Sequence, residues 1–137
     1  MDPDKEVKLE WTGQGLVFRG GPPDGPEVTL DGDGVDGPSP MDALLLSLAG
    51  CMAVDVRMIL EKSRVDVQGV EVETRGERAA EPPRRFTALQ MHFRVVGAGA
   101  EDEPKIERAI QLSRDTYCSV MHTLQPDLKL ETGYERV

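Results

Sequence analysis

Residues 39–56 read SPMDALLLSLAGCMAVDV, and this stretch decides the fold because it begins and fills a long helix. Ser39 suits the N-cap position and Pro40 the first helical position. Asp42 falls in the first turn, where a negative charge meets the positive end of the helix dipole. Apolar residues then follow at helical spacing on several faces until charged residues become frequent from residue 57 onward. The sequence therefore predicts a central helix over residues 39–64 that is buried on most sides.

The rest of the chain predicts short strands and a second helix. Alternation of apolar and polar residues is typical of strands with one packed and one solvated face. Strands are expected at 7–11, 16–18, 27–30, 65–77, 86–96 and 128–134, and further helical segments from the acidic run at 101–104 to about 117 and over 119–124. We expect an α+β fold in the order β-β-β-α-β-β-α-β, with antiparallel sheets packed on central helices.

The length of 137 residues is typical of a single domain with a modest core. We expect one domain over residues 1–137, divided into N-terminal strands and a loop (1–38), the central helix with Cys51 (39–64), a strand pair (65–97), and a second helix with Cys118 and a closing strand (102–137). The aspartates of the loop at 31–38 faintly resemble a calcium loop. No glutamate follows at the twelfth loop position, so we interpret them as part of a solvated turn.

Charge and hydropathy exclude several classes of partner. The net charge of -9 argues against nucleic acid and anionic membranes, because both attract lysine and arginine. The N-terminus has neither the basic nor the apolar region of a secretion signal. The longest apolar stretch, residues 43–54, is too short to span a bilayer. We therefore expect a soluble, cytoplasmic protein that binds neither nucleic acid nor membranes.

Cys51 and Cys118 are the two cysteines, and both lie in helical, mostly apolar surroundings. In a reducing cytosol such thiols are more often free, catalytic or metal-bound than joined in a permanent bridge. A thiol attacks as the thiolate, and burial among leucines disfavours that form, so a positive charge must approach Cys51. Arg19, followed by two glycines, is the best N-terminal candidate. Four further arginines remain open, namely Arg75, Arg78, Arg84 and Arg85.

The contexts of the two cysteines resemble the OsmC/Ohr family of thiol-dependent hydroperoxide reductases. The similarity rests on residues 39–56, on the segment 107–120 with its Tyr-Cys-Ser-Val around Cys118, on the strand at 70–78 and on Phe86-Thr-Ala-Leu. Within the family the chain is most similar to the YhfA-like branch, whose Pro-Met-Glu before the first cysteine is Pro-Met-Asp here. The resemblance covers residues 40–137 well and the first forty loosely.

This resemblance implies a two-cysteine peroxidase that needs no cofactor or metal. Cys51 would be the peroxidatic thiolate, which an organic hydroperoxide oxidises to a sulfenic acid. Cys118 would be the resolving thiol that condenses with it to a transient disulfide, and a dithiol of the lipoyl type would restore both thiols. The family also uses an acidic residue and an N-terminal arginine. Asp42 matches the acidic position, with a side chain one methylene shorter, and Arg19 matches by approximate placement.

Helix geometry places Asp42 out of reach of Cys51 in its own chain. The two residues are nine positions apart, which is about 13–14 Å along one helix. If Asp42 supports Cys51, it must come from a second subunit whose helix packs antiparallel to the first. The resemblance implies the same arrangement, an intertwined two-fold homodimer. An apolar cleft lined by Leu44, Leu48, Met52 and Phe18 would then favour organic hydroperoxides over hydrogen peroxide.

Two other functions remain open. Cys118 and His122 lie four positions apart, and Cys51 with His92 could complete a zinc site, although the usual paired spacing is missing there. Alternatively, the protein is a non-catalytic stress-response or carrier protein that binds a small ligand, with incidental thiols that pack as small hydrophobes. Asp55 lies one turn after Cys51 and can hydrogen-bond within the site; we interpret it as structural.

Overall fold

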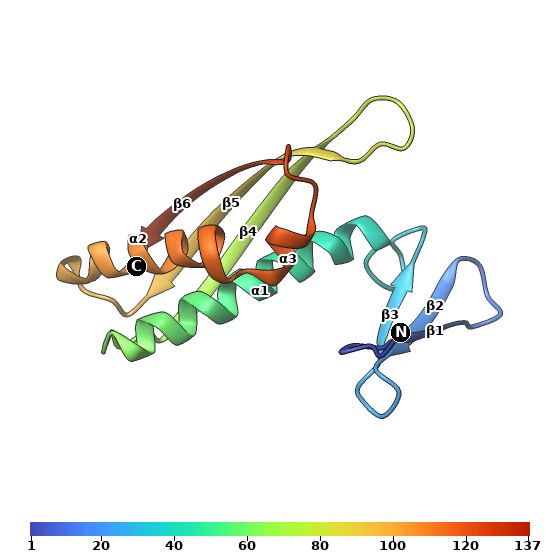
Figure 1. Ribbon diagram of the computed structural model, residues 1–137, viewed down its shortest axis with the longest axis horizontal. Helices are drawn as coiled ribbons and strands as arrows, with labels where there is room; N and C mark the ends of the chain where they lie inside the picture. Colours follow the sequence, from blue (N-terminus) through green and yellow to red (C-terminus); the bar gives the residue numbers. More distant parts are fainter. The chain divides into compact units, whose positions relative to one another are not determined.

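The computed structural model describes all residues from 1 to 137, which form two compact units, 1–44 and 45–137. The first unit contains a three-stranded antiparallel sheet (Figure 1) made of β1 (Lys8–Trp11), β2 (Val17–Gly21) and β3 (Val28–Asp31). The predicted strands therefore lie within one or two residues of their expected places, except that β2 continues to Gly21.

Asp31 explains the aspartate-rich loop that follows β3. Its buried carboxylate accepts hydrogen bonds from the backbone N–H groups of Asp36, Asp33 and Val35, at 3.0, 2.9 and 3.2 Å. These bonds, with that from Asp36 the strongest cause, hold the pKa of the Asp31 carboxyl below its ordinary value although burial opposes them. Asp31, the first aspartate of the loop that resembles a calcium loop, thus stabilises the turn that follows it.

Helix α1 (Pro40–Lys62) begins as the sequence predicts. Ser39 and Asp42 form a reciprocal capping box, in which the Asp42 N–H donates to Ser39 Oγ and the Ser39 N–H donates to Asp42 Oδ2, both at 3.2 Å. The first helical bond runs from the Ala43 N–H to the Ser39 carbonyl at 2.8 Å. The carboxylate of Asp42 is therefore already engaged in starting the helix.

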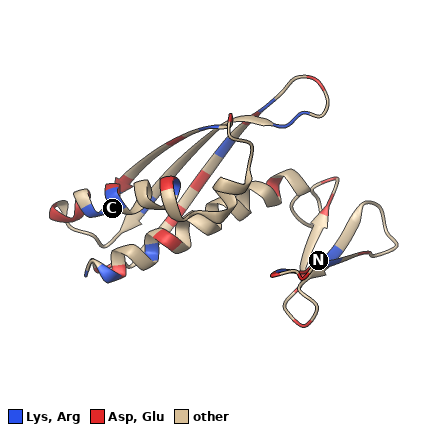
Figure 2. Ribbon diagram, in the orientation of Figure 1, with Lys and Arg blue, Asp and Glu red and all other residues tan.

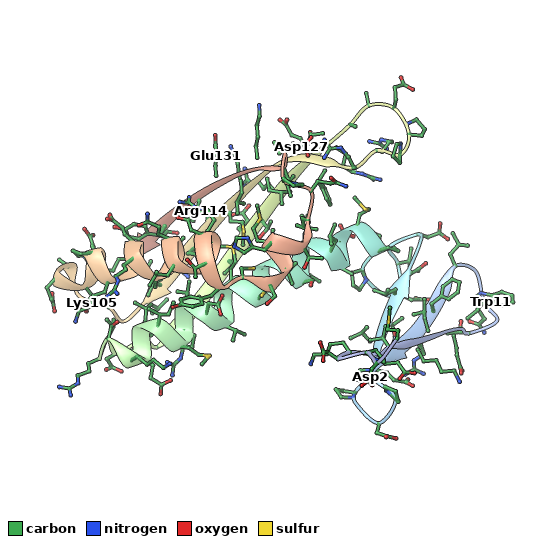
Figure 3. The ribbon with its side chains drawn as sticks, in the orientation of Figure 1. Asp2, Trp11, Lys105, Arg114, Asp127 and Glu131 are labelled. Atoms are coloured by element: carbon green, nitrogen blue, oxygen red, sulfur yellow. The ribbon has the colours of Figure 1, made fainter.

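The C-terminal end of α1 is closed by a residue with left-handed backbone. Arg64 has φ of 61°, and the N–H groups of Arg64 and Val65 donate to the carbonyls of Glu61 and Leu60, both at 3.0 Å. This is the bonding pattern of a Schellman cap, in which glycine is the usual left-handed residue. Lys105 donates from Nζ to the Ser63 carbonyl at 3.1 Å and so adds a cation to this end of the helix (Figure 3).

The second unit contains a sheet in the order β4 (Gly69–Arg78), β5 (Phe86–Val96), β6 (Lys129–Arg136). Strands β4 and β5 pair antiparallel, whereas β5 and β6 pair parallel. The expectation of purely antiparallel sheets was thus wrong at this one pairing. A parallel neighbour requires a long crossover, and residues between β5 and β6 provide it with α2 (Glu103–Leu112), a π turn (Ser113–Tyr117) and α3 (Ser119–Thr123).

The core of this unit lies between the sheet and the helices, which cover one face of it (Figure 1). Strand β5 alternates as predicted, with Met91 and Phe93 buried and His92 exposed on the opposite face. The sheet and helix residues of the core include Leu89, Val95, Leu48, Met52, Val56, Leu60, Ile106, Ala109 and Ile110. The predicted second helix ends earlier than expected, at Leu112, because its last turn widens into the π turn.

Helix α1 carries apolar residues on its outer side as well. Leu46, Val54 and Met58 are 62%, 57% and 50% exposed, and charged residues gather toward the C-terminal end of the helix (Figure 2). The helix is long and apolar enough to cross a membrane by length and composition, and it extends well beyond the stretch 43–54 that the sequence argument considered. The core helix of a soluble protein can have the same length and composition.

Candidate active site around Cys51 and Cys118

Cys51 lies in the middle of α1 and is half-buried. Its helical neighbours Leu48 and Met52 are fully buried in the core, so the cysteine stands at the border between the core and the exposed side of the helix. A thiol in this position is attached to a rigid element and remains partly accessible. Those are two properties that a reacting thiol requires.

Cys118 is fully buried and follows the π turn directly. Its backbone N–H donates to the Ser113 carbonyl at 2.8 Å, which closes the wide turn. Its backbone is extended, and Cys118 is the N-cap of α3, where Sγ accepts a hydrogen bond from the Met121 N–H at 3.3 Å. π turns occur mostly as single turns within α-helices and are frequent at functional sites. This geometry therefore indicates that Cys118 is a functional residue.

The two thiols are close enough to interact. Burial is the largest cause that raises the pKa of Cys118, to about 11, and the nearby Cys51 thiol raises it further. The backbone N–H groups of Met121 and Val120 act in the opposite direction. Cys118 is therefore a protonated thiol at neutral pH, in the neighbourhood of the more accessible Cys51. Both cysteines are free.

A second pair of side chains joins the same two elements. The hydroxyl of Ser113, which is fully buried, donates to Asp55 Oδ2 at 2.8 Å. Asp55 lies one turn after Cys51 on α1, and Ser113 begins the π turn that ends before Cys118. The sequence placed Asp55 one turn after Cys51 and Ser113 within the predicted second helix. It gave no sign that the two would meet across 58 positions.

Arg114 is the arginine nearest to Cys118 in sequence, but it is directed to the sheet. It donates from Nη1 to Thr132 Oγ1 on β6 at 3.2 Å and pairs through Nε with Asp115 at 2.9 Å (Figure 3). Its neighbours thus fix it as a link between the π turn and β6.

The arginines that the sequence left open also have partners of their own. Arg75 pairs with Glu73 at 2.7 Å, and Arg85 with Asp127 at 2.7 Å. The other two belong to the β4–β5 connection, where Arg78 and Arg84 donate to the carbonyls of Arg84 and Ala79 at 2.8 and 3.3 Å. These contacts hold all four guanidinium groups on the strands and the connection between them.

Four of the predicted site residues lie in the first compact unit, namely Phe18, Arg19, Asp42 and Leu44, and are described there by themselves. Arg19 is exposed on β2, with Nε 4.0 Å from Glu27 Oε2, and lines a hollow of about 550 Å³ together with Trp11. Asp42 forms the capping box of α1, and Phe18 is half-buried on β2. Their roles at Cys51 stay predictions.

The residues proposed to line the substrate cleft differ in burial. Leu48 and Met52 are 1% and 0% exposed and pack within the core of the second unit, whereas Leu44 is half-buried. Their role toward a substrate stays a prediction as well.

The four residues of the alternative zinc site are not brought together. His92 lies on the exposed face of the sheet, with Nε2 3.5 Å from Glu135 Oε1, whereas Cys118 is buried on the opposite, helix-covered side. No group of three or more histidine, cysteine, aspartate or glutamate side chains in the chain is placed to hold a metal ion.

Comparison with known proteins identifies the family. The family model of OsmC-like proteins matches residues 31–133. Protein YhfA of Escherichia coli K12 is 38% identical over 133 residues, which cover 96% of this chain and 98% of YhfA.

Solved structures agree with this assignment. A hypothetical protein of Aquifex aeolicus aligns with a TM-score of 0.85 and 29% identity over 98% of this chain and 97% of the other. An organic hydroperoxide resistance protein of Legionella pneumophila aligns with a TM-score of 0.66 over 98% of both chains. At 14% identity this second likeness concerns the fold alone. The matched family model and the identity to YhfA show that the chain belongs to the family of OsmC-like proteins.

Proposed function

We propose that this protein is a thiol-dependent reductase of organic hydroperoxides, with Cys51 as the attacking thiol and Cys118 as the resolving thiol. The observation that carries the proposal is the pairing of a half-buried thiol on a rigid helix with a fully buried thiol, whose pKa the first is near enough to raise. Two neighbouring free thiols can form a disulfide where their Cβ atoms come within about 3.5–4.5 Å of each other. Membership of a family that includes hydroperoxide resistance proteins supports this reading.

The proposed cycle has three steps that balance. In the first, the Cys51 thiolate attacks one oxygen of ROOH, the O–O bond breaks, and the alkoxide takes a proton to leave as ROH. This leaves Cys51 as a sulfenic acid. In the second, Cys118 attacks the Cys51 sulfur, the S–O bond breaks, and the hydroxyl leaves as water with the proton of the Cys118 thiol. In the third, a dithiol exchanges with the disulfide, becomes a disulfide itself and returns both cysteines to thiols.

The contrast between the two thiols supports this division of roles. Cys51 is the partly accessible one, so a peroxide from solution meets it first. Cys118 is buried and its pKa is raised to about 11, so it stays protonated and unreactive toward peroxide at neutral pH. It brings to the second step the proton that the leaving hydroxyl needs.

The homodimer expected from the sequence belongs to this proposal. Exposed Leu46, Val54 and Met58 give α1 an apolar outer side that a second copy would bury. In that dimer Asp42 and Arg19 would support Cys51, as the family resemblance implies, and the residues Phe18, Leu44, Leu48 and Met52 would favour apolar peroxides. A lipoyl-type dithiol as reductant and a cytoplasmic location stay predictions of the same kind.

Consumption of cumene hydroperoxide in the presence of dihydrolipoamide tests the proposal. Wild type is expected to turn over, Cys51→Ser to lose consumption, and Cys118→Ser to react once and then stop. Ser119→Ala, at an exposed serine beside Cys118, is the matched control and is expected to keep the wild-type rate. Equal rates in wild type and Cys51→Ser would contradict the proposal and leave the non-catalytic carrier as the better interpretation.

A further inference from the structure

Asp55 and Ser113 form the side-chain link between the helix of Cys51 and the turn of Cys118. The Ser113 hydroxyl is the side-chain donor to the Asp55 carboxylate, at 2.8 Å, and Ser113 is fully buried. A hydrogen bond from a buried hydroxyl to a partly buried carboxylate is among the stronger bonds in a protein. This pair therefore holds α1 and the π turn in one relative position.

Each member of the pair is directly connected to one cysteine. Asp55 follows Cys51 by one turn of a continuous helix, so the two side chains share a face. Ser113 accepts the hydrogen bond of the Cys118 N–H at 2.8 Å, so a shift of Ser113 moves the backbone of Cys118. The positions of the two sulfur atoms thus depend on the bond between Asp55 and Ser113.

We propose that Asp55 and Ser113 are positioning residues for the resolving step, which set the approach of Cys118 to the oxidised Cys51 sulfur. This inference rests on the proposed function and deepens it. Formation of the disulfide brings the two sulfur atoms to a bond length of about 2.05 Å, with a narrow range of Cβ separations. Such a step is sensitive to misplacement by about 1 Å, whereas attack of a freely diffusing peroxide on Cys51 does not depend on Cys118.

The test separates the two steps in single-turnover experiments with one equivalent of cumene hydroperoxide. Sulfenic acid formation at Cys51 is followed by trapping with dimedone, and disulfide formation by the mass of the linked peptides. In Asp55→Ala and Ser113→Ala we expect the first rate to stay within about twofold, and the second to fall about ten- to a hundredfold, the range expected for loss of a hydrogen bond to a charged group. The amount of Cys51 sulfenic acid that dimedone traps should rise, because the slower second step leaves it more time to react.

Conservative variants and a control from the same turn distinguish positioning from a general loss of structure. Ser113→Thr keeps the hydroxyl and should recover most of the disulfide rate, and Asp55→Asn keeps an acceptor without charge and should lose about threefold. Thr116→Ala removes an exposed hydroxyl from the same π turn and should match wild type. The inference would be overturned if the rate of disulfide formation were unchanged in both alanine variants. It would also be overturned if sulfenic acid formation slowed by the same factor as disulfide formation.

A second measurement does not depend on peroxide. In buffers of reduced and oxidised glutathione, two protein thiols become a disulfide as one oxidised glutathione becomes two reduced ones. To form the disulfide to the same extent, folded alanine variants should need a buffer with about tenfold higher oxidising strength than wild type, and Asp55→Asn about threefold. If wild type does not react with hydroperoxide, but the variants need more oxidising buffer than wild type in this order, the proposed function fails and the positioning role stands. If all variants match wild type, the positioning role fails.

Discussion

Burial gives the two cysteines different chemistry at the scale of single residues. Cys118 has no exposed surface, and this burial, with the nearby Cys51 thiol, raises its pKa to about 11. The backbone N–H groups at the start of α3 only partly oppose these causes. A thiol of this kind reacts slowly with reagents from solution until its partner is oxidised beside it.

Alkylation rates measure this contrast. Because the pKa of Cys118 lies about four units above neutral pH, roughly one thiol in ten thousand is ionised at pH 7. In wild type, iodoacetamide should therefore label Cys51 well before Cys118, and the rate at Cys118 should rise about tenfold for each unit of pH up to about 11. Peptide mapping by mass spectrometry against time gives both rates. Faster labelling of Cys118 at pH 7 would contradict its assigned place as the resolving thiol.

At the scale of elements, the C-terminal end of α1 contains a strained residue. Arg64 holds a left-handed conformation with φ of 61° at the end of α1, where a side chain is disfavoured by roughly 1 kcal/mol or more. Arg64→Gly should remove this strain and so raise the free energy of unfolding by about 1 kcal/mol. The greater conformational freedom of glycine in the unfolded chain offsets part of this gain. Urea unfolding measures the change. Lys62→Gly, in the last turn of the helix, is the control and should lower stability by up to about 1 kcal/mol.

Elements with local signals could be predicted from the sequence, and contacts between distant elements could not. Ser39, Pro40 and Asp42 placed the start of α1 because capping acts within one turn. Alternation placed β5 because its two faces differ in burial. The parallel pairing of β6 has no local signal, since it depends on how the crossover returns to the sheet.

The candidate site shows the same division. The cysteines could be chosen from their contexts, because few other residues here carry redox chemistry. The widening of the second helix into a π turn at Ser113 could not, because nothing in Ser113-Arg-Asp-Thr-Tyr117 interrupts a helix. The bond from Ser113 to Asp55 forms only when the turn packs on α1, so Asp55 could be read as structural but not paired.

At the scale of the whole molecule, the exposed apolar residues on the outer side of α1 favour the proposed dimer. With Leu46, Val54 and Met58 each at least half exposed, a single chain leaves apolar surface in water. Wild type should sediment as a dimer at micromolar concentration, and Val54→Glu should shift it toward monomer, because a charge buried between two copies is unfavourable. Val137→Glu, at a C-terminal side chain that is also 50% exposed, should leave the dimer intact. A wild-type monomer at that concentration would contradict the dimer and the shared site.

The central claim is that Cys51 and Cys118 act as one redox pair, and the mass of the oxidised protein tests it most directly. After one equivalent of cumene hydroperoxide, wild type should lose about two mass units and yield a single Cys51–Cys118 linked peptide, while Cys118→Ser should gain about sixteen at Cys51. The loss of two mass units in wild type should reverse with a dithiol, which exchanges with the disulfide. An unchanged mass with both thiols still titratable, or oxidation that begins at Cys118, would contradict the account.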